Sequence, residues 1–276
     1  MSRVICNICP HFCSLSENQI GLCRARSNIN GEIKAINYGM LTSIALDPIE
    51  KKPLKRFYPG TQILSVGSFG CNLKCSFCQN HGISMANKEE ATARFVTPEE
   101  LVRVALDLKP NGNIGIAYTY NEPLVGYEYV RDCAELVRQK GLKNVLVTNG
   151  CFCEKPMEAL IQYIDALNID LKGFTEEFYH RIGGDLETVK KFIALSSKSC
   201  HVEITTLIIP GENDGEDEIR NLSEFIASIN PDIPLHLSRF FPCYKMRDKS
   251  PTDIALIYRL AETARKTLRY VYEGNC

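Results

Sequence analysis

The stretch GSFGCNLKCSFCQN, residues 67–80, holds three cysteines, Cys71, Cys75 and Cys78, at the spacing C-x3-C-x2-C. It overlaps the end of the apolar run QILSVGS at 62–68, which predicts a buried β-strand. A compact loop that contains glycine can turn three thiolates toward one point. Structural zinc takes four protein ligands and iron–sulfur clusters usually take four thiolates, so three cysteines leave one coordination position open.

Downstream of this loop, apolar runs alternate with amphipathic stretches. Five more strand-like runs follow, at 113–120, 143–150, 165–173, 201–211 and 233–241. Helix-like stretches lie between or after the strands, at 97–109, 124–141, 155–164, 186–198, 216–229 and 251–268. A last strand is predicted at 269–274. Six β-then-α units in a row predict an α/β fold with a parallel sheet and crossover helices.

Polar residues cluster where the predicted strands end. Asn121–Glu122, Thr148–Asn149, and Asp170 with Lys172 all occupy such positions. Sites in β/α barrels lie at the carboxyl ends of the strands. An open doubly wound sheet would carry a site at the same ends. Of these two arrangements we expect a partial (β/α)6 TIM-like barrel with its site at this rim.

The barrel is expected to span residues 41–276 and to follow a cysteine-rich N-terminal segment, residues 1–40. Four cysteines of this segment have the spacing C-x2-C-x3-C-x9-C: Cys6, Cys9, Cys13 and Cys23. Short cysteine spacings suit metal chelation. A closed four-thiolate site would hold either Zn2+ or an auxiliary iron–sulfur cluster, and the spacing alone does not separate the two. The alternative is four cysteines without a metal.

Several other stretches have plain interpretations. An Asn-Gly pair, Asn30–Gly31, predicts a turn between short strands. The basic connection at 48–60 is interpreted as a solvated loop, with anion or partner binding as the alternative. Cys151 and Cys153 are interpreted as free thiols. Cys133 is expected in the core, His81 and His201 in structural roles, and Cys200, Cys243 and Cys276 remain unassigned.

Composition narrows the class of protein. The 276 residues carry a net charge of −1, so no overall basic surface points to nucleic acid. No apolar run approaches the ~18 residues of a membrane span. The N-terminal stretch lacks the apolar core of a secretory signal, so a cytoplasmic location is expected. Without export, the 13 cysteines are expected to be metal ligands, catalytic thiols or small buried residues, not disulfides.

The octapeptide CNLKCSFC, residues 71–78, resembles the radical S-adenosylmethionine (SAM) superfamily, whose pattern is C-x3-C-x-aromatic-C. Phe77 is the aromatic member. The resemblance implies a [4Fe–4S] cluster on Cys71, Cys75 and Cys78, with SAM chelating the open iron. It also implies that an electron from an external donor such as flavodoxin or ferredoxin cleaves SAM, and that the resulting 5′-deoxyadenosyl radical abstracts a hydrogen atom.

Further stretches resemble activases of glycyl-radical enzymes, such as the pyruvate formate-lyase activating enzyme. Glu122 of YNEP matches the acidic member of a Gly-Gly-Glu-like motif that binds the SAM amino group, although Tyr120–Asn121 replace the two glycines. VTNG at 147–150 and IDLKG at 169–173 resemble the next two strand ends. The resemblance implies cofactor contacts from seven residues: Phe77, Glu122, Thr148, Asn149, Asp170, Lys172 and Thr205. A structural ion pair is the alternative for Asp170 and Lys172, and Thr205 stands where the activases carry arginine.

Five stretches spread over nearly the whole chain together resemble the radical SAM member of the AmmeMemoRadiSam system: CNICPHFC at 6–13, NYGMLTSIALDPIEKKPL at 37–54, PGTQILSVGSFGCNLKCSFCQN at 59–80, IAYTYNEP at 116–123 and YVYEGN at 270–275. That family name specifies no substrate. We therefore expect a radical SAM enzyme that takes hydrogen from a protein, peptide or small molecule, with activation of a glycyl-radical protein as one outcome. The lateral opening of an incomplete barrel favours a protein or peptide. One alternative is an iron–sulfur electron-transfer or metal-binding protein without SAM catalysis, which would need four protein ligands for each cluster. A tRNA-modifying relative would need a basic RNA-binding domain.

Overall fold

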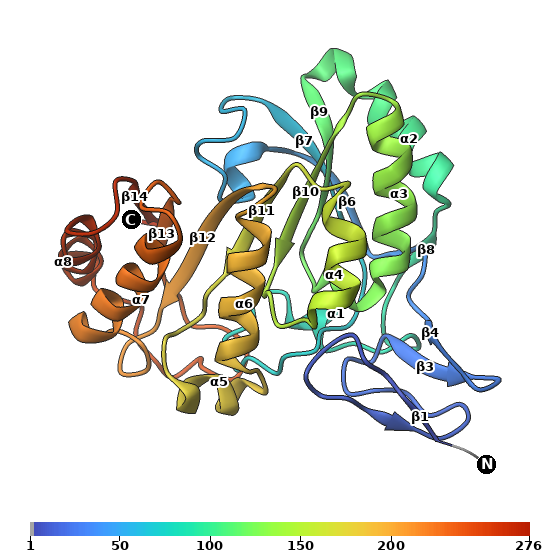
Figure 1. Cartoon of the computed structure of the whole chain (residues 1–276), viewed down its shortest axis with the longest axis horizontal. Coiled ribbons are helices and arrows are strands. Elements are labelled where there is room, and N and C mark those ends of the chain that lie inside the picture. Colours follow the sequence, from blue (N-terminus) through green and yellow to red (C-terminus); the bar gives the residue numbers. More distant parts are fainter. Residues whose placement is uncertain (1–2) are drawn as a thin grey trace.

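The computed structural model describes residues 3–276, apart from the side chain of Lys155, and is built around one eight-stranded sheet (Figure 1). The strands lie in the order β14 (Val271–Gly274), β13 (Leu235–Arg239), β12 (His201–Ile208), β11 (Ala166–Asp170), β10 (Lys143–Thr148), β9 (Asn113–Tyr118), β7 (Gln62–Gly67) and β6 (Ser43–Pro48). Strand β6 is antiparallel to β7, and all other neighbours are parallel. The edge strands β6 and β14 do not pair with each other, so the sheet stays open.

The two faces of the sheet have different partners. Side chains such as Leu64, Ile116 and Leu167 belong to the main core with the helices. The residues that alternate with them, including Ile63 and Ala117, pack against the connection before β7 instead. Helices therefore cover one face and a loop covers the other, as in a barrel and not in a doubly wound sheet. The predicted α/β fold with a partial barrel is confirmed.

Eight α-helices lie within the described residues: α1 (His81–Ser84), α2 (Pro98–Asp107), α3 (Tyr127–Gln139), α4 (Glu154–Ile161), α5 (Glu176–Ile182), α6 (Leu186–Ser196), α7 (Glu216–Ile229) and α8 (Ile254–Arg265). The start of α2 is fixed by a capping box, in which Thr97 accepts from the Glu100 amide and the Glu100 carboxylate accepts from the Thr97 amide. Helix α5 was not predicted, although Thr175 caps its start and left-handed Gly183 ends it. None of these helices is long and apolar enough to cross a membrane.

The N-terminal segment is made of short antiparallel pairs: β1 (Val4–Ile5) with β2 (Ser14–Leu15), and β3 (Arg26–Ile29) with β4 (Glu32–Ala35). The predicted Asn-Gly turn joins β3 and β4, with φ of 55° at Asn30 and 78° at Gly31. A further small pair joins β5 (Met40–Leu41) to β8 (Arg94–Phe95). The domain boundary at residue 40 stays a prediction.

The basic connection before β7 is not a simple solvated loop, so that interpretation is wrong for part of it. The Lys52 side chain is buried, and its Nζ lies 2.9 Å from Asp47 Oδ2. The Arg56 guanidinium lies 3.7 Å from the centre of the Tyr270 ring. The loop instead covers the inner face of the sheet, where Leu54 and Phe57 pack with strand residues.

Glu203 on β12 fastens this loop to the barrel. Its fully buried carboxylate lies 2.9 Å from His201 Nε2 and 2.6 Å from His236 Nε2. The same carboxylate accepts from the backbone amides of Lys55 at 3.0 Å and Arg56 at 2.8 Å. Burial alone would raise the pKa of Glu203, but the hydrogen bonds from the two histidines and the two amides lower it to about 2.

Glu203→Gln is expected to destabilise the protein at neutral pH by about 3 kcal/mol, the free energy that corresponds to this pKa shift. Because the folded pKa is depressed, the stabilisation is present above pH ~4.5 and is lost as the pH falls toward ~2. Urea unfolding of both proteins at pH 7 and at pH 3 measures the difference. A stability gap that is equally large at both pH values would contradict this account.

Candidate functional site

The three-cysteine loop lies between β7 and α1, at the carboxyl end of the parallel sheet. Cys75 is buried, and Cys71 and Cys78 are half-buried. The loop turns sharply at Gly70, which has φ of 88° and leaves no room for a side chain, because a Cβ there would lie 2.5 Å from the Cys23 carbonyl oxygen. The Leu73 amide donates to Cys71 Sγ at 3.4 Å. The backbone thus directs a hydrogen-bond donor at a sulfur atom.

The Cys75 and Cys78 thiols lie close enough to Cys71 to affect the ionisation of Cys71. Burial raises the pKa of Cys71 well above its usual value, and nearby Glu122, Cys75 and Cys78 raise it further. Burial also raises the pKa of Cys75 to about 11, partly opposed by Lys172. Buried thiolates this close together need a cationic group between them in order to ionise. The donor set is therefore suited to a metal centre.

These three thiols are one fewer than the four ligands of a closed metal site. Across residues 3–276, no group of three or more His, Cys, Asp or Glu side chains surrounds a point at which one metal ion would be held. In a four-iron cluster each cysteine binds a different iron, so the ligands stand farther apart than around one ion. Three thiols on one buried loop fit a [4Fe–4S] cluster with one iron left for another ligand.

Asn149, at the end of β10, holds this loop in place. Its Nδ2 lies 3.7 Å from Cys71 Sγ and donates to Asn72 Oδ1 at 2.9 Å. Its Oδ1 accepts from the Cys151 amide at 2.9 Å, and Asn72 Nδ2 donates to the Cys151 carbonyl at 2.8 Å. Asn149 was predicted to contact SAM, and here its amide points at the Cys71 sulfur. The contribution of Asn72 was not predicted.

Glu122 joins the ends of β9 and β10. Its carboxylate is buried and caps the short helix η3 (Pro123–Gly126) by accepting from the Leu124 amide at 3.0 Å. Thr148 Oγ1 donates to Glu122 Oε1 at 2.8 Å, and the Asn149 amide donates to Oε2 at 2.8 Å. Oε1 is then saturated, while Oε2 has one acceptor position left. Burial raises the pKa of Glu122 to about 7, partly opposed by these hydrogen bonds.

Of the two residues before Glu122, where the resembling family has glycines, one adopts a backbone conformation that favours glycine. Tyr120 has φ of 70°, a conformation rarely adopted by a bulky residue. Its hydroxyl donates to Asp47 Oδ2 at 2.7 Å, and Lys52 Nζ lies 4.7 Å from the centre of its ring. Asn121 accepts from the Ser68 amide and donates to the Gly70 carbonyl. The Asn121 contacts tie the end of β9 to the cysteine loop. The cluster formed by Asp47, Lys52 and Tyr120 was not predicted from any sequence pattern.

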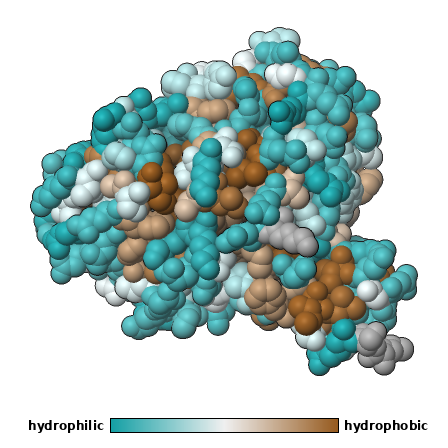
Figure 2. All heavy atoms as spheres, in the orientation of Figure 1, coloured by the Kyte–Doolittle hydropathy of each residue, from teal (hydrophilic) through white to brown (hydrophobic). Residues whose placement is uncertain are grey.

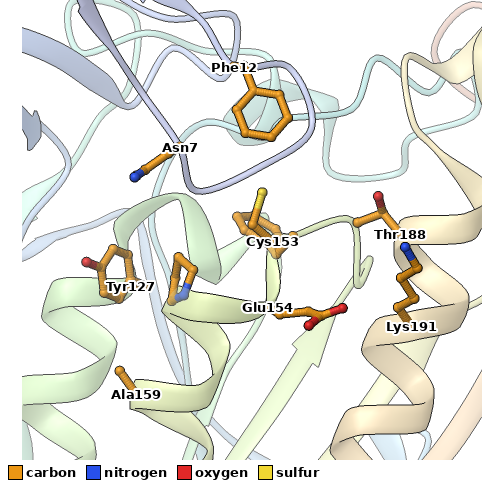
Figure 3. A pocket seen from close by; sticks show the side chains of 10 residues that line it. Asn7, Phe12, Tyr127, Cys153, Glu154, Ala159, Thr188 and Lys191 are labelled. Carbon is orange, nitrogen blue, oxygen red and sulfur yellow. The ribbon is translucent and has the colours of Figure 1, made fainter.

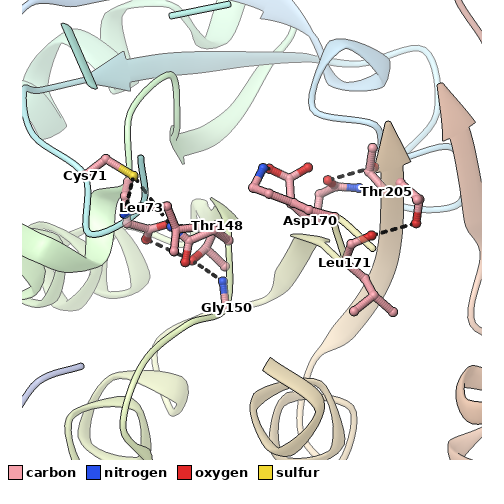
Figure 4. Close-up of polar contacts among 12 residues, drawn as sticks. Cys71, Leu73, Thr148, Gly150, Asp170, Leu171 and Thr205 are labelled. Carbon is pink, nitrogen blue, oxygen red and sulfur yellow. Dashed lines mark hydrogen bonds and ion pairs between the residues drawn. The ribbon is translucent and has the colours of Figure 1, made fainter. Parts of the chain in front are cut away.

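Asp170 lies across the rim from Cys71 (Figure 4). Lys172 Nζ lies 2.8 Å from Asp170 Oδ2, so the two side chains form the ion pair that was considered as the alternative to a cofactor contact. Burial alone would lower the pKa of Lys172, but the Asp170 carboxylate and the Cys75 thiol raise it above its usual value. Thr205, in register with Asp170, donates to Asn168 at 3.0 Å. The Thr205 hydroxyl therefore already donates its hydrogen bond to an acceptor within the protein.

Phe77 is buried, with its ring 6.1 Å from that of Phe178 on α5. Cys243 was unassigned from the sequence, and its Sγ donates to the Phe77 carbonyl at 3.2 Å. The Cys78 thiol is near enough to raise the pKa of Cys243, after the larger effect of burial. The structure thus brings a fourth thiol close to the loop, held by a backbone carbonyl.

Residues 65–223 match the family model of the radical SAM superfamily. An uncharacterized protein of Methanocaldococcus jannaschii is 42% identical over 278 residues, which cover 99% of this chain and 82% of that protein. The pyruvate formate-lyase-activating enzyme of Clostridium pasteurianum is 28% identical over 166 residues, or 58% of this chain and 67% of the enzyme. The crystal structure of Streptococcus suis SuiB bound to precursor peptide SuiA has a TM-score of 0.60 at 16% identity, covering 75% of this chain and 47% of SuiB.

Glu122→Gln is expected to change how stability depends on pH. Because the pKa of Glu122 is raised in the folded protein, the neutral carboxyl stabilises the fold below pH ~4.5, and this contribution is lost as the pH rises through ~7. The wild type should therefore lose about 3 kcal/mol between these pH values, a loss that the glutamine variant lacks. Urea unfolding from pH 4.5 to 8 measures both slopes. Parallel slopes would show that Glu122 is not neutral at low pH in the folded state.

Proposed function

The chain belongs to the radical SAM superfamily, and on that premise we propose that it cleaves SAM reductively with a [4Fe–4S] cluster held by Cys71, Cys75 and Cys78. The supporting observation is that three neighbouring thiols share one buried loop whose position is fixed by Asn149 and Asn121. When bound, the cluster and SAM supply the electron transfer and the 5′-deoxyadenosyl radical. The protein's part is to orient these groups and to exclude water.

Glu122 is suited to receive the amino group of SAM. Its Oε2 has one free acceptor position, and it lies on the same strand-end network as Cys71, through Asn149. A bound ammonium group would stabilise the ionised carboxylate, which the buried site otherwise disfavours at neutral pH. Thr148 and the Asn149 amide hold the carboxylate in a fixed orientation for this contact.

Glu122→Gln is expected to weaken SAM binding by about tenfold or more, because a charge-assisted hydrogen bond contributes about 1.5–3 kcal/mol. Equilibrium binding of SAM to the anaerobically reconstituted proteins measures the effect. The affinity of the wild type should also fall below pH ~7, where the proton competes with the ammonium group for Glu122. Wild-type affinity in the variant at pH 8 would place the amino group elsewhere.

Cys71→Ala, Cys75→Ala and Cys78→Ala are each expected to abolish 5′-deoxyadenosine formation, because each removes one of three ligands. The matched control is Cys243→Ala, which removes the neighbouring thiol that is bonded to the Phe77 carbonyl. We expect this variant to keep its cluster and its SAM cleavage. Iron content and 5′-deoxyadenosine yield are the measurements.

Cys243 also separates this proposal from the alternative of an electron carrier without SAM catalysis. A carrier needs a fourth protein ligand on its cluster. Cys243, which contacts the Phe77 carbonyl, is the candidate for that ligand. Loss of the cluster in Cys243→Ala, with no SAM cleavage by the wild type, would favour the carrier.

We further propose a protein or peptide as the substrate. Support comes from the likeness to an activating enzyme of pyruvate formate-lyase and from the fold shared with SuiB, whose structure contains a precursor peptide. The sheet is open between β6 and β14, which leaves a side from which a peptide loop could approach the rim. Polar and charged side chains, including Tyr120 and the Asp170–Lys172 pair, are present near that rim. A small metabolite is the competing substrate.

Deuterium transfer distinguishes these substrates. Candidate proteins carrying deuterium at glycine α-carbons, and separately a pool of deuterated small metabolites, are supplied to the reduced enzyme with SAM. We expect deuterium in 5′-deoxyadenosine from a protein donor. Transfer from a metabolite, with none from any protein, would contradict the proposal while leaving SAM cleavage intact.

A further inference from the structure

Strand β6 is an edge of the sheet with one side unpaired. Its residues Ser43–Pro48 pair only with β7, in antiparallel register. The Ile49 amide, directly after the strand, donates to the Thr61 carbonyl at 3.0 Å, which fixes which residues bond across this ladder. In an antiparallel ladder, alternate residues direct both backbone groups toward the partner strand or both away from it. Ile44 and Leu46 therefore direct their N–H and C=O groups away from β7.

These outward backbone groups are not used elsewhere in the protein. Within residues 3–276, no hydrogen bond joins the main chain of Ile44 or Leu46 to a group outside the β6–β7 pair. The edge is also accessible to solvent, since Ile44 is 39% exposed and Ala45 beside it is exposed as well. Two backbone donors and two backbone acceptors thus stand in a row along an open edge.

The opposite edge of the sheet is protected. Strand β14 is shorter, and its Val271 carbonyl accepts from Arg265 Nη2 at 3.1 Å. Arg265 also pairs with Glu273 of the same strand at 2.6 Å. Proteins commonly blunt edge strands with short length, charged side chains or proline, because an open edge pairs with other chains. Strand β6 carries no lysine or arginine, and its proline is its last residue, so its edge is left available.

The free edge of β6 leads to the cysteine loop. Because β6 is antiparallel to β7, its first residue, Ser43, stands opposite Gly67 at the carboxyl end of the parallel sheet. The Thr42 amide donates to the Gly67 carbonyl at 2.8 Å, and Thr42 Oγ1 donates to the Ser68 carbonyl at 2.9 Å. Gly67 and Ser68 are the residues through which the chain enters the loop of Cys71. A peptide laid along β6 would therefore be guided to the rim.

The gap between the two edge strands is closed at its other end. The connection before β7 begins where β6 ends, and its Arg56 guanidinium lies 3.7 Å from the centre of the Tyr270 ring, directly before β14. The backbone amides of Lys55 and Arg56 are fastened to Glu203. Access along β6 is therefore left at the end that carries the cysteine loop.

We propose that the free edge of β6 binds the substrate as an added β-strand, bonded to the main chain of Ile44 and Leu46, and delivers its target residue to the rim. The inference rests on the proposed protein or peptide substrate. In strand addition, main-chain hydrogen bonds supply affinity and alternate side chains supply specificity. Peptide residues opposite Ile44 and Leu46 would share the sheet face of these apolar side chains. The recognised segment is thus extended, with an apolar residue at every second position.

A second copy of the chain is the competing occupant, and the surface around β6 disfavours it. Specific protein interfaces bury ~1,000 Å2 or more, and Ile44 is the one exposed large apolar side chain of β6. Figure 2 shows apolar side chains on the N-terminal segment instead, where Ile5, Phe12 and Leu22 are 61%, 54% and 64% exposed. Phe12 there borders a cavity of about 660 Å3 against helices α4 and α6 (Figure 3). An apolar contact between copies would use that face, which includes no residue of β6.

Hydrogen exchange tests the open edge without SAM or a reductant. In the reconstituted protein, the amides of Ala45 and Asp47, which face β7, should exchange roughly tenfold or more slowly than those of Ile44 and Leu46. Mass spectrometry with fragmentation to single residues resolves these four amides. Equal exchange of all four would overturn the proposal. Protection of Ile44 and Leu46 that appears only as the protein concentration rises, with a dimer mass by light scattering, would assign the edge to a second copy instead.

A model peptide tests strand addition. The acetylated and amidated octapeptide KTVTVTVK, at millimolar concentration, should slow the exchange of the Ile44 and Leu46 amides several-fold. The same peptide methylated at every backbone nitrogen cannot donate to the edge and should have no effect. Slowing by both peptides, or by neither, would contradict binding through the main chain.

Ile44→Pro removes one outward N–H that the β6–β7 ladder does not use, and Ile44→Ala is its matched control because it removes the side chain and keeps the N–H. Protection of the Leu46 amide by the peptide should be lost in Ile44→Pro and kept in Ile44→Ala. Slow exchange of Ala45 and Asp47 verifies the fold of each variant. If Ile44→Pro does not fold, the methylated peptide still decides the proposal.

The same pair of variants tests the edge as the path of the substrate. Deuterium transfer from a protein donor into 5′-deoxyadenosine should be lost in Ile44→Pro and kept in Ile44→Ala. Equal transfer in the wild type and both variants would rule out β6 as the binding edge. Absence of SAM cleavage by the wild type would instead refute the proposed function, and the exchange measurements would still decide whether β6 binds a peptide.

Discussion

Three thiols confined to one buried loop are the constraint on which the rest of this structure depends. The loop has no core of its own, so neighbouring elements fix its position. Asn149 approaches Cys71 from β10, Asn121 bonds the Gly70 carbonyl from β9, and the Cys23 carbonyl accepts from the Cys71 amide. Three separate parts of the chain therefore determine where the sulfurs lie. A parallel sheet brings the first two together because its strand ends meet at one edge.

Several ionisable side chains inside the barrel have hydrogen-bonding partners within the protein. Lys52 lies against Asp47, Lys172 against Asp170, and Glu203 between two histidines. Burying an unpaired charge costs several kcal/mol, which explains why these groups pair within the protein. Glu122 differs, because only neutral donors surround its carboxylate and its pKa is raised. It is the buried carboxylate of the rim that a cationic ligand would stabilise most.

Local patterns predicted much of this molecule. Strand and helix order follow from apolar periodicity, and the cysteine loop follows from its spacing. Long-range contacts could not be predicted from local patterns. Tyr120 adopts a glycine-like φ because Asp47 binds its hydroxyl, and the Lys52 side chain turns inward to the same carboxylate. Cys243 contacts the carbonyl of Phe77, the residue before Cys78, although Cys243 and Cys78 are 165 positions apart in the chain. Helix α5 was missed because it is short and lies between a strand and a second helix.

The central claim is that the cluster on Cys71, Cys75 and Cys78 keeps one iron for SAM. Electron–nuclear double resonance on the reduced protein tests it most directly, using SAM labelled with 15N at the amino group. The account predicts a hyperfine coupling between the label and the cluster, and an EPR spectrum that changes when SAM is added. A reduced cluster whose spectrum is unaffected by SAM, with no coupling to the label, would contradict it.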